Sequence, residues 1–168
     1  RHQGGYTPFA ADIAPFAHVG QNRLEVRVHD DARENTASGK QSAKQQSYGC
    51  FYTRTTGIWQ SVWLERTPRN YLRSVRFFPD VSRCAVDVEL VAEGGGTAQI
   101  AVFYDGREVG RAAGEVGYRR TFRIALEEAH LWEVGNGRLY TVSIALDDDR
   151  VESYFGLREV RFDGRRFL

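Results

Sequence analysis

The sequence predicts an all-β protein in which an immunoglobulin-like β-sandwich follows an incomplete first sheet. After residue 67, short segments of alternating apolar and polar residues recur at regular spacing, with turn residues between them. Before residue 67 only a few such segments are found, and a long polar stretch interrupts them. No stretch shows the apolar period of a strong amphipathic helix.

The first region contains too few strands to close a sheet on itself. Its alternating segments are 4–13, 23–29 and 58–65. In the second of these, Leu24, Val26 and Val28 share one face. Because a small sheet with one apolar face needs cover, we expect further strands upstream of this chain. Without that cover, we expect an apolar patch and self-association through the first region.

Two tryptophans share one face of the last strand expected in this region. Trp59 and Trp63 are separated by four positions in an alternating segment, so both point away from Ile58 and Val62. They form an aromatic platform that stacks on sugar, or they pack in a core or a domain interface. Both interpretations are open.

A long polar segment, 30–49, precedes that strand and has almost no apolar anchor. Compact domains rarely keep loops beyond roughly 12–15 residues unless these are functional or disordered. The segment is therefore either a surface loop or a loop that reaches over a binding pocket.

The second region has about seven predicted strands in roughly 95 residues, which is the size of an immunoglobulin-like sandwich. The predicted strands are 71–78, 85–91, 97–104, 108–112, 118–126, 138–146 and 150–162. Asp105-Gly106 is a hairpin turn signal between two of them. Segment 127–132 is expected to form one helical turn or an irregular crossing.

Composition excludes several classes of function. The chain has 168 residues and a net charge of +1, which gives no argument for nucleic-acid binding. It has no apolar run near the roughly 18 residues that span a membrane, so no membrane partner is expected. It starts at Arg1 without a signal-peptide pattern, so we expect a piece of a longer protein.

The cysteines and histidines form no recognisable ligand group. Cys50 and Cys84 are far apart, and we expect two free thiols in a cytoplasmic, reducing compartment. The four histidines show no metal-site spacing, so no metal or cofactor is expected.

Several motifs taken together resemble glycoside hydrolase family 2, which contains β-galactosidases, β-glucuronidases and β-mannosidases. The motifs are Gly4-Gly5-Tyr6-Thr7-Pro8-Phe9, the strand 22–28, Gly39-Lys40-Gln41, Tyr52-Thr53-Arg54-Thr55-Thr56-Gly57-Ile58-Trp59-Gln60, His130-Leu131-Trp132, Arg138-Leu139-Tyr140 and Ser153-Tyr154-Phe155-Gly156-Leu157-Arg158. Their order and spacing extend over nearly the whole chain.

This resemblance implies a domain order. Residues 1–66 would be the C-terminal part of a sugar-binding jelly-roll domain of galactose-binding type. Residues 67–163 would be the immunoglobulin-like sandwich, and 164–168 would begin the linker to a catalytic (β/α)₈ barrel of the same protein. The fold class is therefore an all-β sandwich preceded by a partial jelly-roll sheet.

By the same resemblance, loops of the first domain approach the mouth of the barrel. The residues that this implies at the rim of a substrate pocket are Lys40, Gln41, Tyr52 and Arg54. An arginine can grip a sugar hydroxyl or carboxylate through its fork of donors. The alternative is that Arg54 pairs with a nearby carboxylate or backbone carbonyl and fixes the loop.

No catalytic residue is predicted in this chain. Retaining glycosidases need two carboxyl groups about 5–5.5 Å apart, one with a raised pKa. The acidic residues here fall mostly on the solvent faces of predicted strands. We therefore expect a non-catalytic piece of a family 2 enzyme, most similar to β-galactosidase, that scaffolds and shapes the pocket. Sugar would bind only within the full-length parent. The alternatives are a stand-alone carbohydrate-binding module and a structural β-sandwich that binds protein.

Overall fold

The structure is a computed structural model that describes all residues except 31–36, 38, 45, 165 and 168. The chain divides into two compact units, Arg1–Leu64 and Glu65–Leu168.

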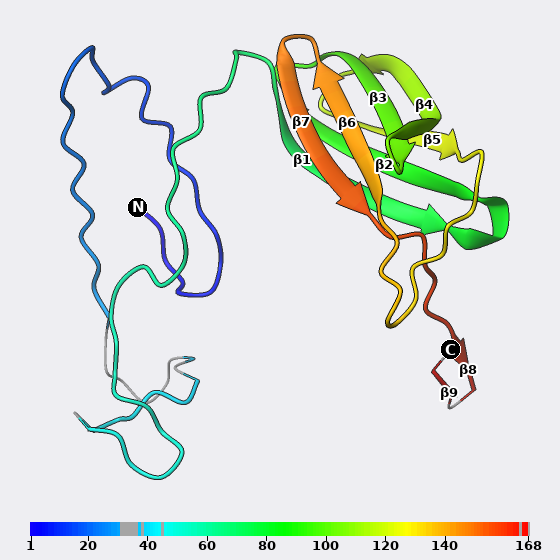
Figure 1. Cartoon of the computed structure of the whole chain (residues 1–168). Helices are drawn as coiled ribbons and strands as arrows, with labels where there is room; N and C mark the ends of the chain where they lie inside the picture. The colour runs from blue at the N-terminus through cyan, green and yellow to red at the C-terminus, as the bar shows by residue number, and fades with distance from the viewer. Residues whose placement is uncertain (31–36, 38, 45, 165, 168) are drawn as a thin grey trace. The chain divides into compact units, whose positions relative to one another are not determined.

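The second unit is a sandwich of two antiparallel sheets (Figure 1). One sheet has the strand order β1-β2-β5, and the other has the order β4-β3-β6-β7. The strands are β1 (Tyr71–Asp80), β2 (Ala85–Glu93), β3 (Gly96–Tyr104), β4 (Arg107–Val116), β5 (Arg119–Ala125), β6 (Tyr140–Leu146) and β7 (Asp149–Phe155). A short ribbon of β8 (Phe162–Asp163) and β9 (Arg166–Phe167) follows. The predicted all-β class and the predicted sandwich are confirmed.

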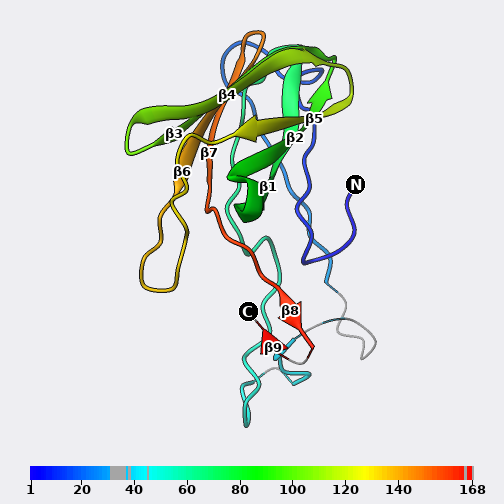
Figure 2. The same ribbon diagram turned by 90° about the vertical axis from the view of Figure 1, so that its right-hand side faces the viewer.

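Alternation along each strand puts apolar side chains between the two sheets. In β2, Val86, Val88 and Leu90 are fully buried, whereas Asp87 and Glu89 face outward and are partly exposed. In the opposite sheet, Ile100 and Val102 of β3 and Ile144 of β6 are buried in the same way. The sheets approach each other at β4 and β5, which lie side by side (Figure 2). One continuous apolar core therefore holds the unit together.

The outer face of the β1-β2-β5 sheet is covered by charged pairs across strands. Arg123 of β5 lies 3.1 Å from Asp87 of β2 and 2.6 Å from Asp80 at the end of β1. Asp80 also caps a 3-10 turn, η1 (Val81–Arg83), by accepting a hydrogen bond from the Arg83 amide at 3.1 Å. Opposite charges on neighbouring strands stabilise the pairing of this sheet.

Turn chemistry and strand ends follow the sequence closely. Asp105 and Gly106 have φ angles of 50° and 77°, as the two-residue turn between β3 and β4 requires. Each predicted strand overlaps an observed one, but the last ends at Phe155 instead of 162. The chain leaves the sheet there because Leu157 bridges to Leu131 of the β5–β6 connection. That connection is irregular at 127–132. Of the two structures expected there, the irregular crossing is confirmed and the helical turn is not.

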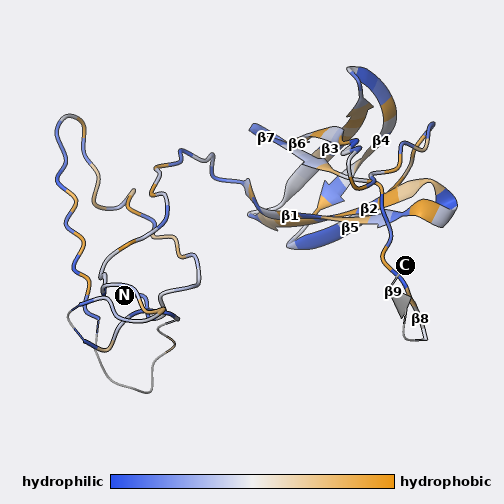
Figure 3. Cartoon of the chain, turned by 60° about the horizontal axis from the view of Figure 1, so that its bottom comes forward, coloured by the Kyte–Doolittle hydropathy of each residue, from blue (hydrophilic) through white to orange (hydrophobic). Residues whose placement is uncertain are grey.

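The first unit forms no strand among its described residues, so the paired strands predicted over 4–13, 23–29 and 58–65 are wrong. The described pairing within it consists of two isolated bridges, Gln41 with Tyr52 and Tyr48 with Phe51. Apolar and polar residues alternate along its extended trace (Figure 3). The apolar residues described in this unit remain exposed, since its described residues form no sheet that could bury them.

Candidate functional site

The first unit brings together the backbones of three of the four predicted rim residues. The Tyr52 amide donates to the Lys40 carbonyl at 2.8 Å. The Ser42 amide donates to the Tyr52 carbonyl at 2.7 Å, and Gln41 lies opposite Tyr52 in a parallel bridge. Segments that are twelve residues apart, around 40 and around 52, are thus joined as a small loop cluster.

Side-chain contacts of Asp30 and Gln41 with residues 54–56 complete this cluster. Arg54 Nη2 lies 3.3 Å from Asp30 Oδ1, and Thr56 Oγ1 donates to Asp30 Oδ2 at 3.0 Å. Gln41 Oε1 accepts from the Thr55 amide at 3.2 Å. The ion pair agrees with the alternative in which Arg54 fixes the loop. Asp30 was not predicted as a site residue, although it stands at the start of the polar segment.

A buried serine anchors the loop between the two segments. Ser42 is fully buried, donates through Oγ to the Gln46 carbonyl at 2.8 Å and accepts from the Lys44 amide at 2.9 Å. The Lys44 ammonium lies 4.3 Å from the centre of the Tyr48 ring. Much of the predicted long loop, 31–36 with 38 and 45, falls outside the described residues.

The two tryptophans of the predicted aromatic platform, Trp59 and Trp63, are both largely exposed. Trp59 is 67% exposed, its indole N–H donates to the Gly5 carbonyl at 2.8 Å, and its ring meets the edge of Tyr6. Trp63 is 73% exposed. Neither is buried in a core of the first unit.

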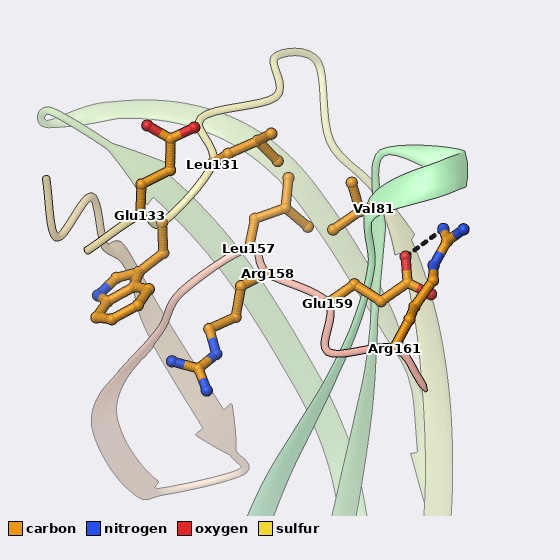
Figure 4. A pocket seen from close by; sticks show the side chains of 8 residues that line it. Val81, Leu131, Glu133, Leu157, Arg158, Glu159 and Arg161 are labelled. Carbon is orange, nitrogen blue, oxygen red and sulfur yellow. Dashed lines mark hydrogen bonds and ion pairs between the residues drawn. The ribbon is translucent and has the colours of Figure 1, made fainter. Parts of the chain in front are cut away.

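The second unit holds an open pocket of about 370 Å³ at the end of its β5–β6 connection. Val81, Leu131 and Leu157 point toward one another and form its apolar floor (Figure 4). The remaining lining residues are Trp132, Glu133, Arg158, Glu159 and Arg161. None of these was predicted as a site residue.

Two segments that are distant in the sequence build this pocket. The Trp132 amide donates to the Leu157 carbonyl at 3.0 Å, beside the parallel bridge between Leu131 and Leu157. The Arg158 guanidinium lies 4.7 Å over the Trp132 ring, a cation–π contact. Gly156 leaves room for the tryptophan, since a Cβ there would lie 3.0 Å from Trp132 Cβ. The segment after β7 is thereby fastened to the β5–β6 connection.

The signal for this pocket was present in the sequence as two separate motifs. His130-Leu131-Trp132 and Gly156-Leu157-Arg158 both belong to the family-like motifs, but no periodicity linked them. Their contact depends on the tertiary arrangement of β6 and β7, which strand alternation does not specify.

A tyrosine at the start of β6 holds the other end of the same connection. The Tyr140 hydroxyl donates to the Glu128 carbonyl and accepts from the His130 amide, both at 2.7 Å. Its ring is fully buried and stacks on Phe155 at 5.0 Å, and burial raises the pKa of the Tyr140 phenol. This is the arrangement of the tyrosine corner in immunoglobulin-like sandwiches.

Two carboxyl groups, that of Glu159 in the pocket and that of Glu128 in the β5–β6 connection, have pKa values below their usual range. Arg161 donates to Glu159 at 2.5 Å, and this hydrogen bond lowers the pKa of Glu159 below its usual value. The hydrogen bond from His130 has the same effect on the pKa of Glu128. A general acid for glycoside hydrolysis needs a raised pKa, so neither group suits that role.

The parts of the chain that the structure describes offer no clear metal site. No group of three or more His, Cys, Asp and Glu side chains there could hold a metal ion. Cys50 and Cys84 are free thiols. No helix among the described residues is long and apolar enough to cross a membrane.

Comparison with known proteins finds β-glucuronidases among the relatives of this chain. No protein-family model matches the chain. The chain is 25% identical to a β-glucuronidase of Paenibacillus borealis, with 99% of this chain and 31% of the relative covered. It is 24% identical to a β-glucuronidase of Streptococcus agalactiae, with 99% of this chain and 30% of the relative covered. The chain thus spans about a third of the length of the curated relatives that it matches.

A solved structure supports the fold. The β-glucuronidase of Ruminococcus gnavus in complex with D-glucaro-d-lactam matches 60% of this chain and 18% of its own, with a TM-score of 0.50 and 22% identity. The expectation that β-galactosidase is the most similar type is not supported, since the relatives are β-glucuronidases. The predicted resemblance to glycoside hydrolase family 2 is confirmed, with β-glucuronidase as the closer type.

Proposed function

We propose that this chain is a non-catalytic part of a glycoside hydrolase that acts on β-glucuronides. It scaffolds that enzyme through the sandwich and shapes its substrate pocket through the loop cluster of the first unit. The observation that carries this proposal is the match over 99% of this chain to only 31% of a β-glucuronidase.

The lowered pKa values of Glu159, which lines the pocket, and of Glu128 in the β5–β6 connection support a non-catalytic role. Glu159 is paired with Arg161, and Glu128 accepts from His130, so both have lowered pKa values. The catalytic acid and nucleophile would then come from another domain of the enzyme. The free thiols Cys50 and Cys84 support a reducing, cytoplasmic location.

The basic residues of the loop cluster fit an acidic sugar. Lys40 and Arg54 are cations of the cluster, and Tyr52, whose amide donates to the Lys40 carbonyl, is 67% exposed. In the proposed role, Arg54 remains paired with Asp30 and adds part of its fork of donors to a substrate carboxylate.

Turnover by the isolated chain tests the proposal. The purified chain is incubated with 4-nitrophenyl β-D-glucuronide and with the corresponding galactoside, and nitrophenol release is followed. The proposal predicts no release above a buffer control. Hydrolysis of either substrate that is lost in Glu159→Gln or Glu133→Gln would overturn it.

A stand-alone carbohydrate-binding module is the second candidate, and the exposure of Trp59 and Trp63 favours it. Calorimetric titration with glucuronate separates the two functions. Saturable heat that is lost in Trp63→Ala and retained in Trp132→Ala would favour the binding module. No heat from the isolated chain is the result expected for a part of an enzyme.

A further inference from the structure

The tip of the β5–β6 connection is a tight turn that presents an asparagine followed by glycine. The Glu133 amide donates to the Asn136 carbonyl at 3.1 Å, and the Asn136 amide donates to the Glu133 carbonyl at 2.9 Å. Gly135, in the centre of this turn, has a φ of 83°. Asn136 and Gly137 are both exposed.

This dipeptide is unique in the chain. Of the four asparagines, only Asn136 precedes glycine. Asn22 precedes Arg23 and Asn70 precedes Tyr71, and in both cases a side chain shields the next amide nitrogen. Asn35, which precedes a threonine, falls outside the described residues. Glycine lacks a Cβ, so it gives the backbone the freedom to bring its own nitrogen onto a neighbouring side chain.

An attack of the backbone nitrogen of Gly137 on the Asn136 side chain needs both groups to be free of hydrogen bonds. Among the described interactions, the Gly137 N–H has no acceptor and the Asn136 carboxamide has no partner. Asn22 differs, because its amide nitrogen donates to the His18 and Gly20 carbonyls and its oxygen accepts from the His18 amide. Asn70 is held against Gly94, where its Oδ1 occupies the space of a Cβ.

We propose that Asn136 is a site of spontaneous deamidation and isoaspartate formation. A water-derived base removes the proton of the Gly137 amide, and that nitrogen attacks Asn136 Cγ. The bond from Cγ to Nδ2 breaks, and ammonia leaves with the proton returned from solvent. Water then opens the resulting cyclic imide at either carbonyl and leaves aspartate or isoaspartate at position 136.

The product changes both charge and backbone at the pocket. Each product adds one carboxylate three positions after the pocket residue Glu133 and two positions before Arg138. Isoaspartate also lengthens the main chain by a methylene. The Asn136 carbonyl accepts from Glu133 and from Arg138, at 3.1 and 3.0 Å, and a lengthened main chain cannot keep both bonds. The modification therefore opens the turn that carries the pocket residue Glu133.

Ageing of the purified chain tests this proposal. The full chain is incubated at mildly alkaline and at mildly acidic pH and digested with trypsin. Deamidated and isoaspartyl forms of the peptides that contain Asn22, Asn70 and Asn136 are then measured by mass spectrometry. The expected result is accumulation at Asn136 well ahead of the other two, faster at alkaline pH. The deamidated and isoaspartyl forms of that peptide should be lost in Asn136→Gln. This variant keeps Gly137, but attack by the Gly137 nitrogen on the glutamine side chain must close a larger ring.

Two further variants keep the test decisive. Gly137→Ala shields the attacking nitrogen and should suppress the reaction, although its Cβ would lie 3.3 Å from Trp132 Nε1. Val134→Ala changes a 94% exposed residue of the same turn and should leave the rate unchanged. Modification of Asn22 or Asn70 at the same rate as Asn136, or no modification of Asn136 during alkaline ageing, would overturn the proposal.

Discussion

Two segments of this chain have the same alternating pattern, but the apolar side chains of one are buried and those of the other are exposed. In β2, Val86, Val88 and Leu90 are each 0% exposed. In segment 23–29, Leu24, Val26 and Val28 are 72%, 58% and 46% exposed. β2 lies between β1 and β5, with full ladders on both sides. Alternation therefore defines which face is apolar, but partner strands decide whether that face is buried.

The largest effect that separates the two segments is expected from matched truncations of leucine. Leu90→Ala leaves a cavity in the sandwich core and should lower the free energy of unfolding by about 2–5 kcal/mol. Leu24→Ala removes a side chain that is 72% exposed and should change it by no more than about 0.5 kcal/mol. Urea unfolding of both variants measures the difference. Equal effects would mean that segment 23–29 has a core that the structure does not contain.

The next effect concerns the tyrosine at the start of β6. Tyr140→Phe leaves the His130 amide and the Glu128 carbonyl without their partner, which should cost about 1–2 kcal/mol of unfolding free energy. Tyr154→Phe removes a hydroxyl from a residue that is 66% exposed and serves as control. If the two variants are equally stable, the hydroxyl does not hold the β5–β6 connection.

A smaller effect is expected from crowding at the pocket. Gly156→Ala places a Cβ 3.0 Å from Trp132 Cβ and should destabilise the second unit by about 1 kcal/mol. Trp132 fluorescence should shift in the same variant as the ring moves from Leu157 and Arg158. Gly117→Ala meets no atom within 4 Å and should change neither quantity. An unchanged spectrum in Gly156→Ala would show that the glycine does not position the tryptophan.

The smallest effect is a dependence of stability on pH through Asp80. Hydrogen bonds from Ser82 and Arg123 lower the pKa of Asp80 from the usual 3.8 to about 2. Between these two pH values the unfolded chain binds more protons than the folded one, so the contribution of Asp80 to stability is complete above pH 3.8 and is lost as pH falls to 2.

The corresponding comparison is between the natural chain and Asp80→Asn. The difference in their unfolding free energies should be constant at neutral pH and shrink as pH falls through that range. Ser82→Ala should remove part of the difference, because Ser82 makes the largest contribution to the shift. A difference that stays the same down to pH 2 would contradict the assignment.

The sandwich could be predicted from the sequence because its signals are local. Val86, Val88 and Leu90 alternate within one strand, and Asp105-Gly106 marks a hairpin within two residues. Whether a sheet forms before residue 67 could not be predicted in this way. Segment 23–29 has the same local pattern as β2, but its burial depends on neighbouring strands, which the pattern does not specify.

The candidate site shows the same division. Gln41, Tyr52 and Arg54 were predicted through family-like motifs, and the structure joins Gln41 to Tyr52 by a bridge. Asp30 was missed because it is 24 residues from its partner Arg54. The pocket around Trp132 and Leu157 was missed for the same reason, since its two halves are about 25 residues apart in the sequence and are joined by tertiary contacts.

Hydrogen exchange of backbone amides in the intact chain tests the central claim most directly. The claim is that pairing with partner strands, and not alternation, decides which segments form stable structure. It predicts slow exchange in β2, β3 and β6, which each have two neighbouring strands, and fast exchange in segments 23–29 and 58–64. Slow exchange in segment 23–29 that equals that of β2 would contradict it.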